Sequence, residues 1–77
     1  MPDQVRSRKM EITIKDDFIK LGQAMKLARL VMDGAEAKFE IQEGKVLVNG
    51  QEELRRGRKL VPGDSFTYNG QEVTVRR

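Results

Sequence analysis

Apolar residues occupy every second position from residue 10 to residue 14. Met10, Ile12 and Ile14 alternate with polar residues, and two of the three are β-branched. This period of two is typical of a strand with one buried face. Asp16 and Asp17 follow, and their side-chain oxygens can accept hydrogen bonds from the first free amides of a helix. The pattern therefore predicts a strand followed by the start of a helix.

From Phe18 to about Met32 the apolar period becomes helical. The predicted helix has two apolar faces: Phe18, Leu21, Ala24, Met25 and Ala28 on one, and Ile19, Leu27 and Leu30 on the other. A helix that is apolar on two sides has to be covered on two sides. We expect the sheet to cover one face and a second helix to cover the other.

A second helix is predicted to begin at Asp33. Asp33 and Glu36 have the spacing of a capping box, in which each side chain accepts a hydrogen bond from a free backbone amide. The helix is expected to pass through Ala37 and Ile41 and to stop at Gly44, because glycine readily adopts the left-handed conformation that ends helices.

The remainder of the chain has the pattern of short strands and tight turns. Turn signals at Asn49-Gly50, Pro62-Gly63 and Asn69-Gly70 separate the apolar positions. Those positions are Val46 and Val48, then Leu60 and Val61, then Phe66 and Tyr68, and finally Val73 and Val75. A further short strand is expected to begin at Leu54.

These elements predict an α+β fold in the order β-α-α-β-β-β, with two short helices on one face of a small, mostly antiparallel sheet. At 77 residues the chain has room for a single core. We assign residues 1–9 to a flexible basic arm, since they show no hydrophobic period, and residues 10–77 to one domain.

Composition excludes several classes of function. The chain has no cysteine and no histidine, which removes thiolate ligands, disulfides, the usual zinc ligand and the usual general base. No apolar run approaches the length that spans a membrane, and the N-terminus lacks the apolar core of a signal peptide. We therefore expect a cytoplasmic protein that is not an enzyme, with no cofactor, no bound metal, no membrane partner and no small-molecule substrate.

The most informative chemistry is a cluster of cations between the strands. Four of the five residues from 55 to 59 are positively charged: Arg55, Arg56, Arg58 and Lys59. Cations this close repel one another unless an anion binds, and the commonest polyanion for a small basic protein is nucleic acid. The net charge of +3 is mild, so the clustering matters more than the total. The alternative is a solvated turn that Glu52 and Glu53 partly neutralise.

Several motifs in order along the chain resemble a known family, the RNA-binding domain named after ribosomal protein S-four. The residues are Leu21-Gly22-Gln23, Lys26-Leu27, Gly34, Ala37-Lys38, Val46-Leu47-Val48-Asn49-Gly50, Arg55-Arg56-Gly57-Arg58-Lys59-Leu60 and Gly63-Asp64. They are most similar to its short free-standing bacterial branch, the YaaA-like proteins. The resemblance spans roughly residues 12–68. Many members of the wider family have Ser-Arg where this chain has Asp33-Gly34, and the family's first-helix arginine is matched by Lys20.

The resemblance implies a non-catalytic module that grips phosphates of structured RNA, ribosomal or transfer RNA, with the ribosome as a candidate partner. The RNA-binding residues it implies are Arg55, Arg56, Arg58, Lys59, Lys26, Lys38, Lys20 and Asn49, although Asn49 also suits a turn. The residues alone leave two alternatives open. One is an adaptor that binds an acidic protein, and the other is a DNA-binding module.

Two further groups of residues favour structural roles. Three Phe and one Tyr are barely enough for a core, so we expect all four to pack in the core or sheet rather than to stack on bases. The acidic pairs Asp16-Asp17 and Glu52-Glu53 lie at predicted element boundaries. Caps and turns account for such pairs better than a catalytic dyad or a Mg²⁺ site does.

Overall fold

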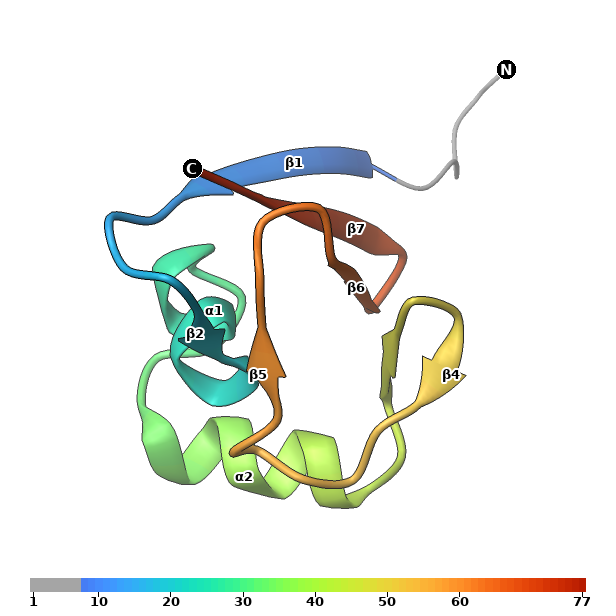
Figure 1. The fold of residues 1–77 in the computed structure, drawn as a ribbon. Coiled ribbons are helices and arrows are strands. Elements are labelled where there is room, and N and C mark those ends of the chain that lie inside the picture. Colours follow the sequence, from blue (N-terminus) through green and yellow to red (C-terminus); the bar gives the residue numbers. More distant parts are fainter. Residues whose placement is uncertain (1–7) are drawn as a thin grey trace.

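The computed structural model describes residues 8–77, which form two helices and seven short strands (Figure 1). In chain order they are β1 (Arg8–Thr13), β2 (Ile19–Lys20), α1 (Leu21–Leu27), α2 (Gly34–Gln42), β3 (Val46–Val48), β4 (Gln51–Glu52), β5 (Lys59–Leu60), β6 (Ser65–Tyr68) and β7 (Gln71–Arg76). The first strand begins at Arg8, two residues before the predicted start. Residues 1–7 of the predicted arm lie outside the described residues.

The main sheet has five strands in the order β1-β7-β6-β3-β4. The β1–β7 pair is parallel, and the other three pairs are antiparallel. Val73 lies opposite Met10 on one side and Phe66 on the other, and Phe66 lies opposite Val48. Residues opposite one another share a face of the sheet, so this row forms a continuous apolar surface. The predicted small, mostly antiparallel sheet is confirmed.

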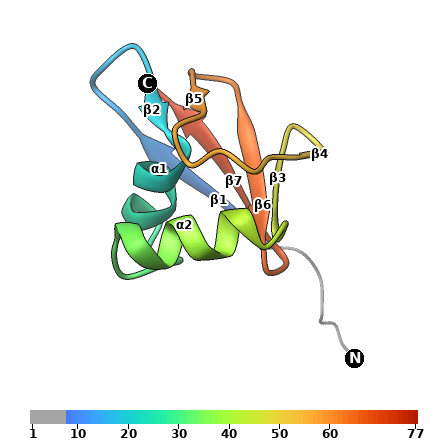
Figure 2. The same ribbon diagram turned by 90° about the horizontal axis from the view of Figure 1, so that it is seen from below.

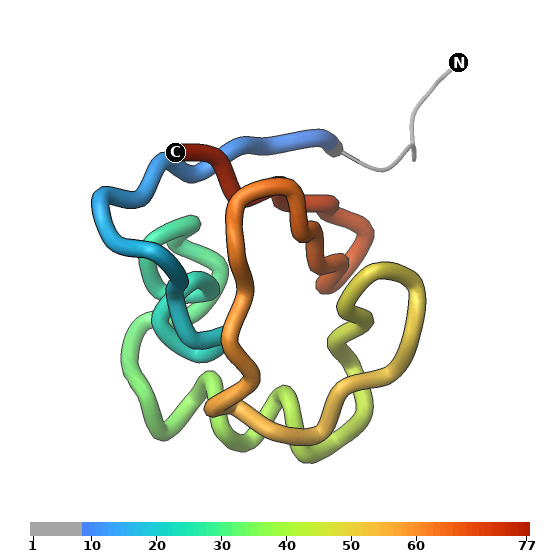
Figure 3. The backbone as a smooth tube through the Cα atoms, in the orientation of Figure 1, coloured from blue at the N-terminus to red at the C-terminus, as the bar shows by residue number. Residues whose placement is uncertain are grey.

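Both helices lie on the same side of the main sheet, as predicted (Figures 1 and 2). The core lies between the helices and the sheet, and its largest fully buried side chains are Phe66, Leu21, Met25, Ile41, Leu60, Val46, Val73 and Val75. No helix within residues 8–77 is long and apolar enough to cross a membrane. The path of the backbone carries the segment between β4 and β5 past α2 before it enters β5 (Figure 3).

Helix α1 is shorter than predicted at both ends. Ile19 and Lys20 are extended because they pair with β5 in a separate two-stranded sheet. Lys20 is the N-cap residue, so the predicted capping by Asp16 and Asp17 is wrong. At the other end Arg29 adopts a φ of 61°, which ends the helical run well before Met32. Both apolar faces of this helix were predicted to be covered. Leu27, on the second face, is nevertheless 51% exposed.

Helix α2 follows the predicted capping pattern with one shift. The Glu36 amide donates to Oδ1 of Asp33 at 2.8 Å, as expected. The Glu36 carboxylate, however, accepts from the amide of Met32 at 2.7 Å, one residue before the predicted partner. Gly44 follows the helix with a φ of 79°, the left-handed conformation predicted for it.

The strand predicted to begin at Leu54 is absent from the structure. Asn49 and Gly50 both have positive φ, which makes a two-residue hairpin turn and returns the chain at once into β4. The pairing therefore involves Gln51 and Glu52 instead. Leu54 lies outside any strand and is 51% exposed.

Candidate functional site

The basic loop, residues 55–59, is fastened to the start of α1 through its backbone. The amide of Leu21 donates to the Arg58 carbonyl at 2.8 Å, and the amide of Gly22 donates to the Arg56 carbonyl at 3.0 Å. These are among the first amides of α1, which have no partner within the helix. The loop therefore does for α1 what a capping side chain usually does, and its position is tied to that helix.

A buried carboxylate organises the same loop from within. Glu53 is only 6% exposed, and its Oε2 accepts from Nε of Arg55 at 2.9 Å and from the Arg55 backbone amide at 3.1 Å. Its Oε1 accepts from a guanidinium nitrogen of Arg58 at 2.8 Å. The hydrogen bonds from Arg55 and then Arg58 lower the pKa of Glu53 to about 2, although burial acts in the opposite direction. Partial neutralisation of the cluster by Glu52 and Glu53 is the alternative that the sequence leaves open. In the structure Glu53 neutralises Arg55 and Arg58.

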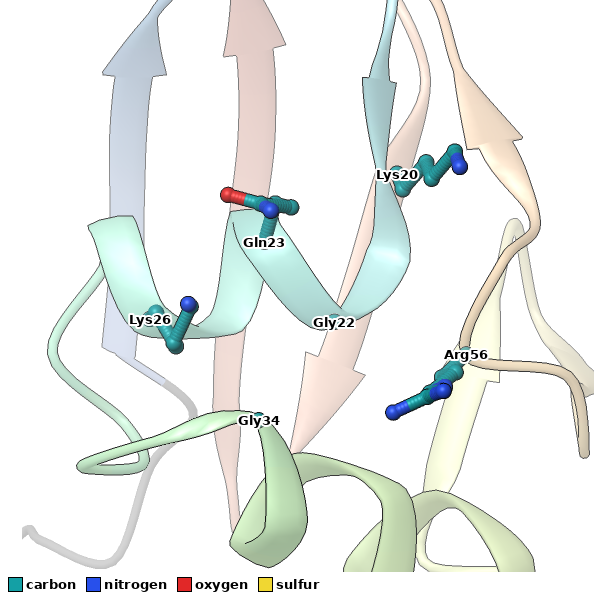
Figure 4. A pocket seen from close by; sticks show the side chains of 6 residues that line it. All are labelled: Lys20, Gly22, Gln23, Lys26, Gly34 and Arg56. Carbon is teal, nitrogen blue, oxygen red and sulfur yellow. The ribbon is translucent and has the colours of Figure 1, made fainter.

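Three other cations surround a hollow of about 220 Å³ beside this loop (Figure 4). Lys20 comes from the end of β2, Lys26 from α1 and Arg56 from the basic loop. Figure 4 shows the Arg56 side chain extending toward the space between the two helices. The remaining lining residues are Gly22, Gln23 and Gly34. No ion pair within residues 8–77 involves Lys20, Lys26 or Arg56.

Close packing at Gly22 brings the walls of this hollow together. A Cβ added at Gly22 would lie 3.5 Å from Cβ of Arg56 and 3.7 Å from Cβ of Ala37. The basic loop, α1 and α2 therefore meet at one point. Residues that are more than thirty positions apart in sequence contribute to one surface.

Lys59 extends the basic surface onto the small sheet. It lies directly opposite Lys20 in the antiparallel β2–β5 pair, so the two side chains share a face. The ammonium of Lys59 lies 4.7 Å from the centre of the Phe18 ring. Gly57, together with Arg55, Arg58 and Lys59, lines a second and more open hollow of about 510 Å³.

Two of the predicted binding residues do not line these hollows. Lys38 is exposed on α2, one helical turn after Gly34. Asn49 has a φ of 51° and uses both ends of its amide within the protein. Its Nδ2 donates to Asp64 at 3.2 Å, and its Oδ1 accepts from the amide of Ser65 at 3.1 Å. These contacts are those of a turn residue.

The expectation that all four aromatic residues pack inside is wrong for two of them. Phe66 is fully buried in the core, and Tyr68 is half-buried and donates to Glu40 at 2.7 Å. Phe18 is 38% exposed and Phe39 is 58% exposed. Phe18 does not reach the core because it lies before β2, outside the helix in which it was predicted, so it does not share a face with Leu21 and Met25.

Sequence reasoning identified Lys20, Lys26 and Arg56 separately but did not bring them together. The pairing of β2 with β5 brings Lys20 beside the basic loop, and no local pattern in the sequence predicts that pairing. Within residues 8–77 no group of three or more acidic side chains is placed to hold a metal ion.

Comparison with known proteins gives one family match. The family model described as S4 domain matches residues 12–76. The "Probable ribosome maturation protein RlbA" of Bacillus subtilis is 44% identical over 59 residues, which cover 77% of this chain and 83% of that protein. The "Putative RNA-binding protein YbcJ" of Escherichia coli is 36% identical over 61 residues, which cover 79% of this chain and 87% of that protein.

Proposed function

This chain belongs to the S4 domain family, and on that premise we propose that it is a non-catalytic RNA-binding module. It grips phosphates of structured RNA, with ribosomal RNA as the first choice and transfer RNA as the second. The primary grip consists of Lys20, Lys26 and Arg56, and Lys59 continues it. Arg55, Arg58 and Lys38 contribute at its margins, and Asn49 acts as scaffold.

The observation that carries the proposal is the hollow lined by Lys20, Lys26 and Arg56. Three like charges from three elements converge there, and no carboxylate within residues 8–77 pairs with them. Such an arrangement is electrostatically unfavourable in the free protein and favourable once a phosphate enters. An arginine fork can meet a phosphate with two parallel hydrogen bonds, while the lysines act as point charges.

The relatives point to the same class of ligand. One is named for ribosome maturation and the other for RNA binding, and the chain matches most of the length of each. Folded RNA suits this surface better than a long single strand, because a strand binder needs a row of stacking aromatics. The absence of histidine and cysteine from the sequence supports a binding role rather than a catalytic one.

The test measures affinity for a structured RNA, such as a ribosomal RNA hairpin, at several salt concentrations. If about five phosphates are neutralised, log affinity falls with log salt at a slope of about −4. Replacing Lys20, Lys26 and Arg56 together with Ala weakens binding strongly and makes the slope shallower by about three. The matched control replaces Lys9, Lys45 and Arg77 with Ala, which removes equal charge away from the hollow.

Equal losses in the two triple variants would mean that only net charge matters, and the proposed grip would be wrong. Competition by duplex DNA of equal charge separates RNA from DNA binding. A protein purified at low salt that carries no nucleic acid, and that binds an acidic protein instead, would support the adaptor in place of the RNA module.

A further inference from the structure

An exposed aromatic ring lies at the border of the basic surface. Phe18 is 38% exposed, although the sequence predicts it in the core. It immediately precedes β2, and its ring lies beside Lys59, which is directly opposite Lys20 in the β2–β5 pair. The ammonium of Lys59, 4.7 Å from the ring centre, covers part of the ring.

The ring also borders a hollow of about 250 Å³ with a mixed lining. Its apolar side consists of Ile14, Phe18, Ile19 and Leu27, and its polar side of Thr13, Lys15 and Asp16. Leu27 is 51% exposed and follows Gln23 by one turn of α1. Because Gln23 lines the basic hollow, the two hollows adjoin along the same side of that helix. A partly apolar recess thus lies next to the proposed phosphate-binding residues.

Lys20 and Lys59 determine which class of ligand can bind beside this recess. Like charges directly opposite one another across a strand pair repel, so a phosphate between them is favourable. When Lys59 turns toward that phosphate, it leaves the face of the Phe18 ring. The ring is then free to stack on a flat partner covalently attached to the phosphate. A nucleotide is the ligand that carries both parts.

We propose that the surface formed by Phe18, Lys20, Leu27 and Lys59 binds an unpaired base. The base stacks on Phe18 beside Leu27, and its phosphate lies between Lys20 and Lys59. The inference rests on the proposed RNA-binding function and defines its ligand more narrowly. A base inside a continuous duplex is covered on both faces and cannot reach the ring. The preferred RNA therefore has a bulged or single-stranded nucleotide beside a helical segment.

The experiment compares two RNA hairpins that differ by one unpaired adenosine in the stem. The intact protein is expected to bind the bulged hairpin about 5- to 10-fold more tightly than the paired one, as a single base–aromatic stack would give. Phe18→Leu keeps apolar bulk at the site but removes the ring, and it should abolish that preference while leaving affinity for the paired hairpin unchanged. Phe39→Leu, which removes the other exposed ring, should retain the preference.

The possible outcomes separate this inference from the proposed function. Equal affinity of the intact protein for both hairpins overturns the inference and leaves RNA binding intact. Binding of neither hairpin overturns both. If Phe18→Leu retains the preference for the bulge but turns a dimer into a monomer in sedimentation, a second copy of the chain covers this edge and the inference is wrong. Quenching of 2-aminopurine at the bulge by the intact protein, lost in Phe18→Leu, supports it.

Discussion

Two loops of this protein are each held by a carboxylate, yet only one presents free cations. In residues 53–59, Glu53 binds Arg55 and Arg58 while Arg56 lines the hollow beside α1 and α2. In the other loop, Asp64 accepts from the Val61 amide and from the side chain of Asn49, and the polar groups satisfy one another. The scaffold loop, residues 61–64, contains no Lys or Arg, so it has no cation to present. Within the basic loop, the hydrogen-bond partners of each side chain separate Arg56, which has no ion-pair partner in residues 8–77, from Arg55 and Arg58, which bind Glu53.

Among single substitutions, the largest effect is expected from Glu53→Ala. Removing a negative charge would raise RNA affinity if net charge alone mattered. We expect the reverse, a loss of about 5- to 10-fold, because the loop loses the buried acceptor that fixes its shape. Stability should also fall by about 1–2 kcal/mol. The measurements are an RNA titration and a urea unfolding curve on the same preparation.

Asp64→Ala sharpens the comparison as a matched variant. It removes two exposed hydrogen bonds from the scaffold loop, so stability should fall by about 1 kcal/mol, less than in Glu53→Ala. RNA affinity should not change. A gain in affinity for Glu53→Ala would show that the basic loop holds its shape without Glu53, through its backbone bonds to α1 alone.

The second prediction compares two neighbouring arginines. Arg56 has no ion-pair partner within residues 8–77, whereas Arg55 is bonded to Glu53. Arg56→Ala should weaken RNA binding by about 5-fold and reduce the salt slope by about one. Arg55→Ala should weaken it by no more than about 2-fold, because its charge is already compensated. Equal losses for the two variants would contradict the distinction between free and tied cations.

The distinction between free and paired cations also shows which features could be predicted from the sequence. Periodicity and turn residues predicted most of the strands of the main sheet, α2 and the Gly44 helix end, because the conformation of each segment is favoured by its own residues. The start of α1 was misplaced because a long-range pairing of Ile19 and Lys20 with β5 overrides the helical pattern there. The charges in the site were visible in the sequence. Their separation into free and tied members required knowing where Glu53 lies.

The third prediction concerns acid stability. The pKa of Glu53 is lowered to about 2 in the folded protein, chiefly by the hydrogen bond from Arg55. A depressed folded-state pKa means that the carboxylate stabilises the fold fully above its unfolded pKa and that this stability is lost as pH falls toward the folded one. The difference in melting temperature between the intact protein and Glu53→Gln should therefore shrink as pH falls from about 5 to about 2.

This difference isolates Glu53. The pKa of Glu40 is also lowered, first by the hydrogen bond from Tyr68, but Glu40 is present in both proteins and its effect cancels. A difference in melting temperature that stays constant across the whole pH range would contradict the assigned role of the Glu53 carboxylate.

The smallest effect is expected from Asn49→Gly, in the β3–β4 turn that is hydrogen-bonded to the scaffold loop. Glycine accepts the φ of 51° that Asn49 adopts, so the variant removes only the two side-chain hydrogen bonds to Asp64 and Ser65. Because both bonds lie at an exposed turn, stability should fall by about 1 kcal/mol or less, measured by thermal unfolding. RNA affinity should remain that of the intact protein, since both ends of the amide are held by hydrogen bonds within the protein, and Asn49 does not line either basic hollow. A loss of RNA affinity without a loss of thermal stability would mean that the Asn49 side chain contacts the RNA.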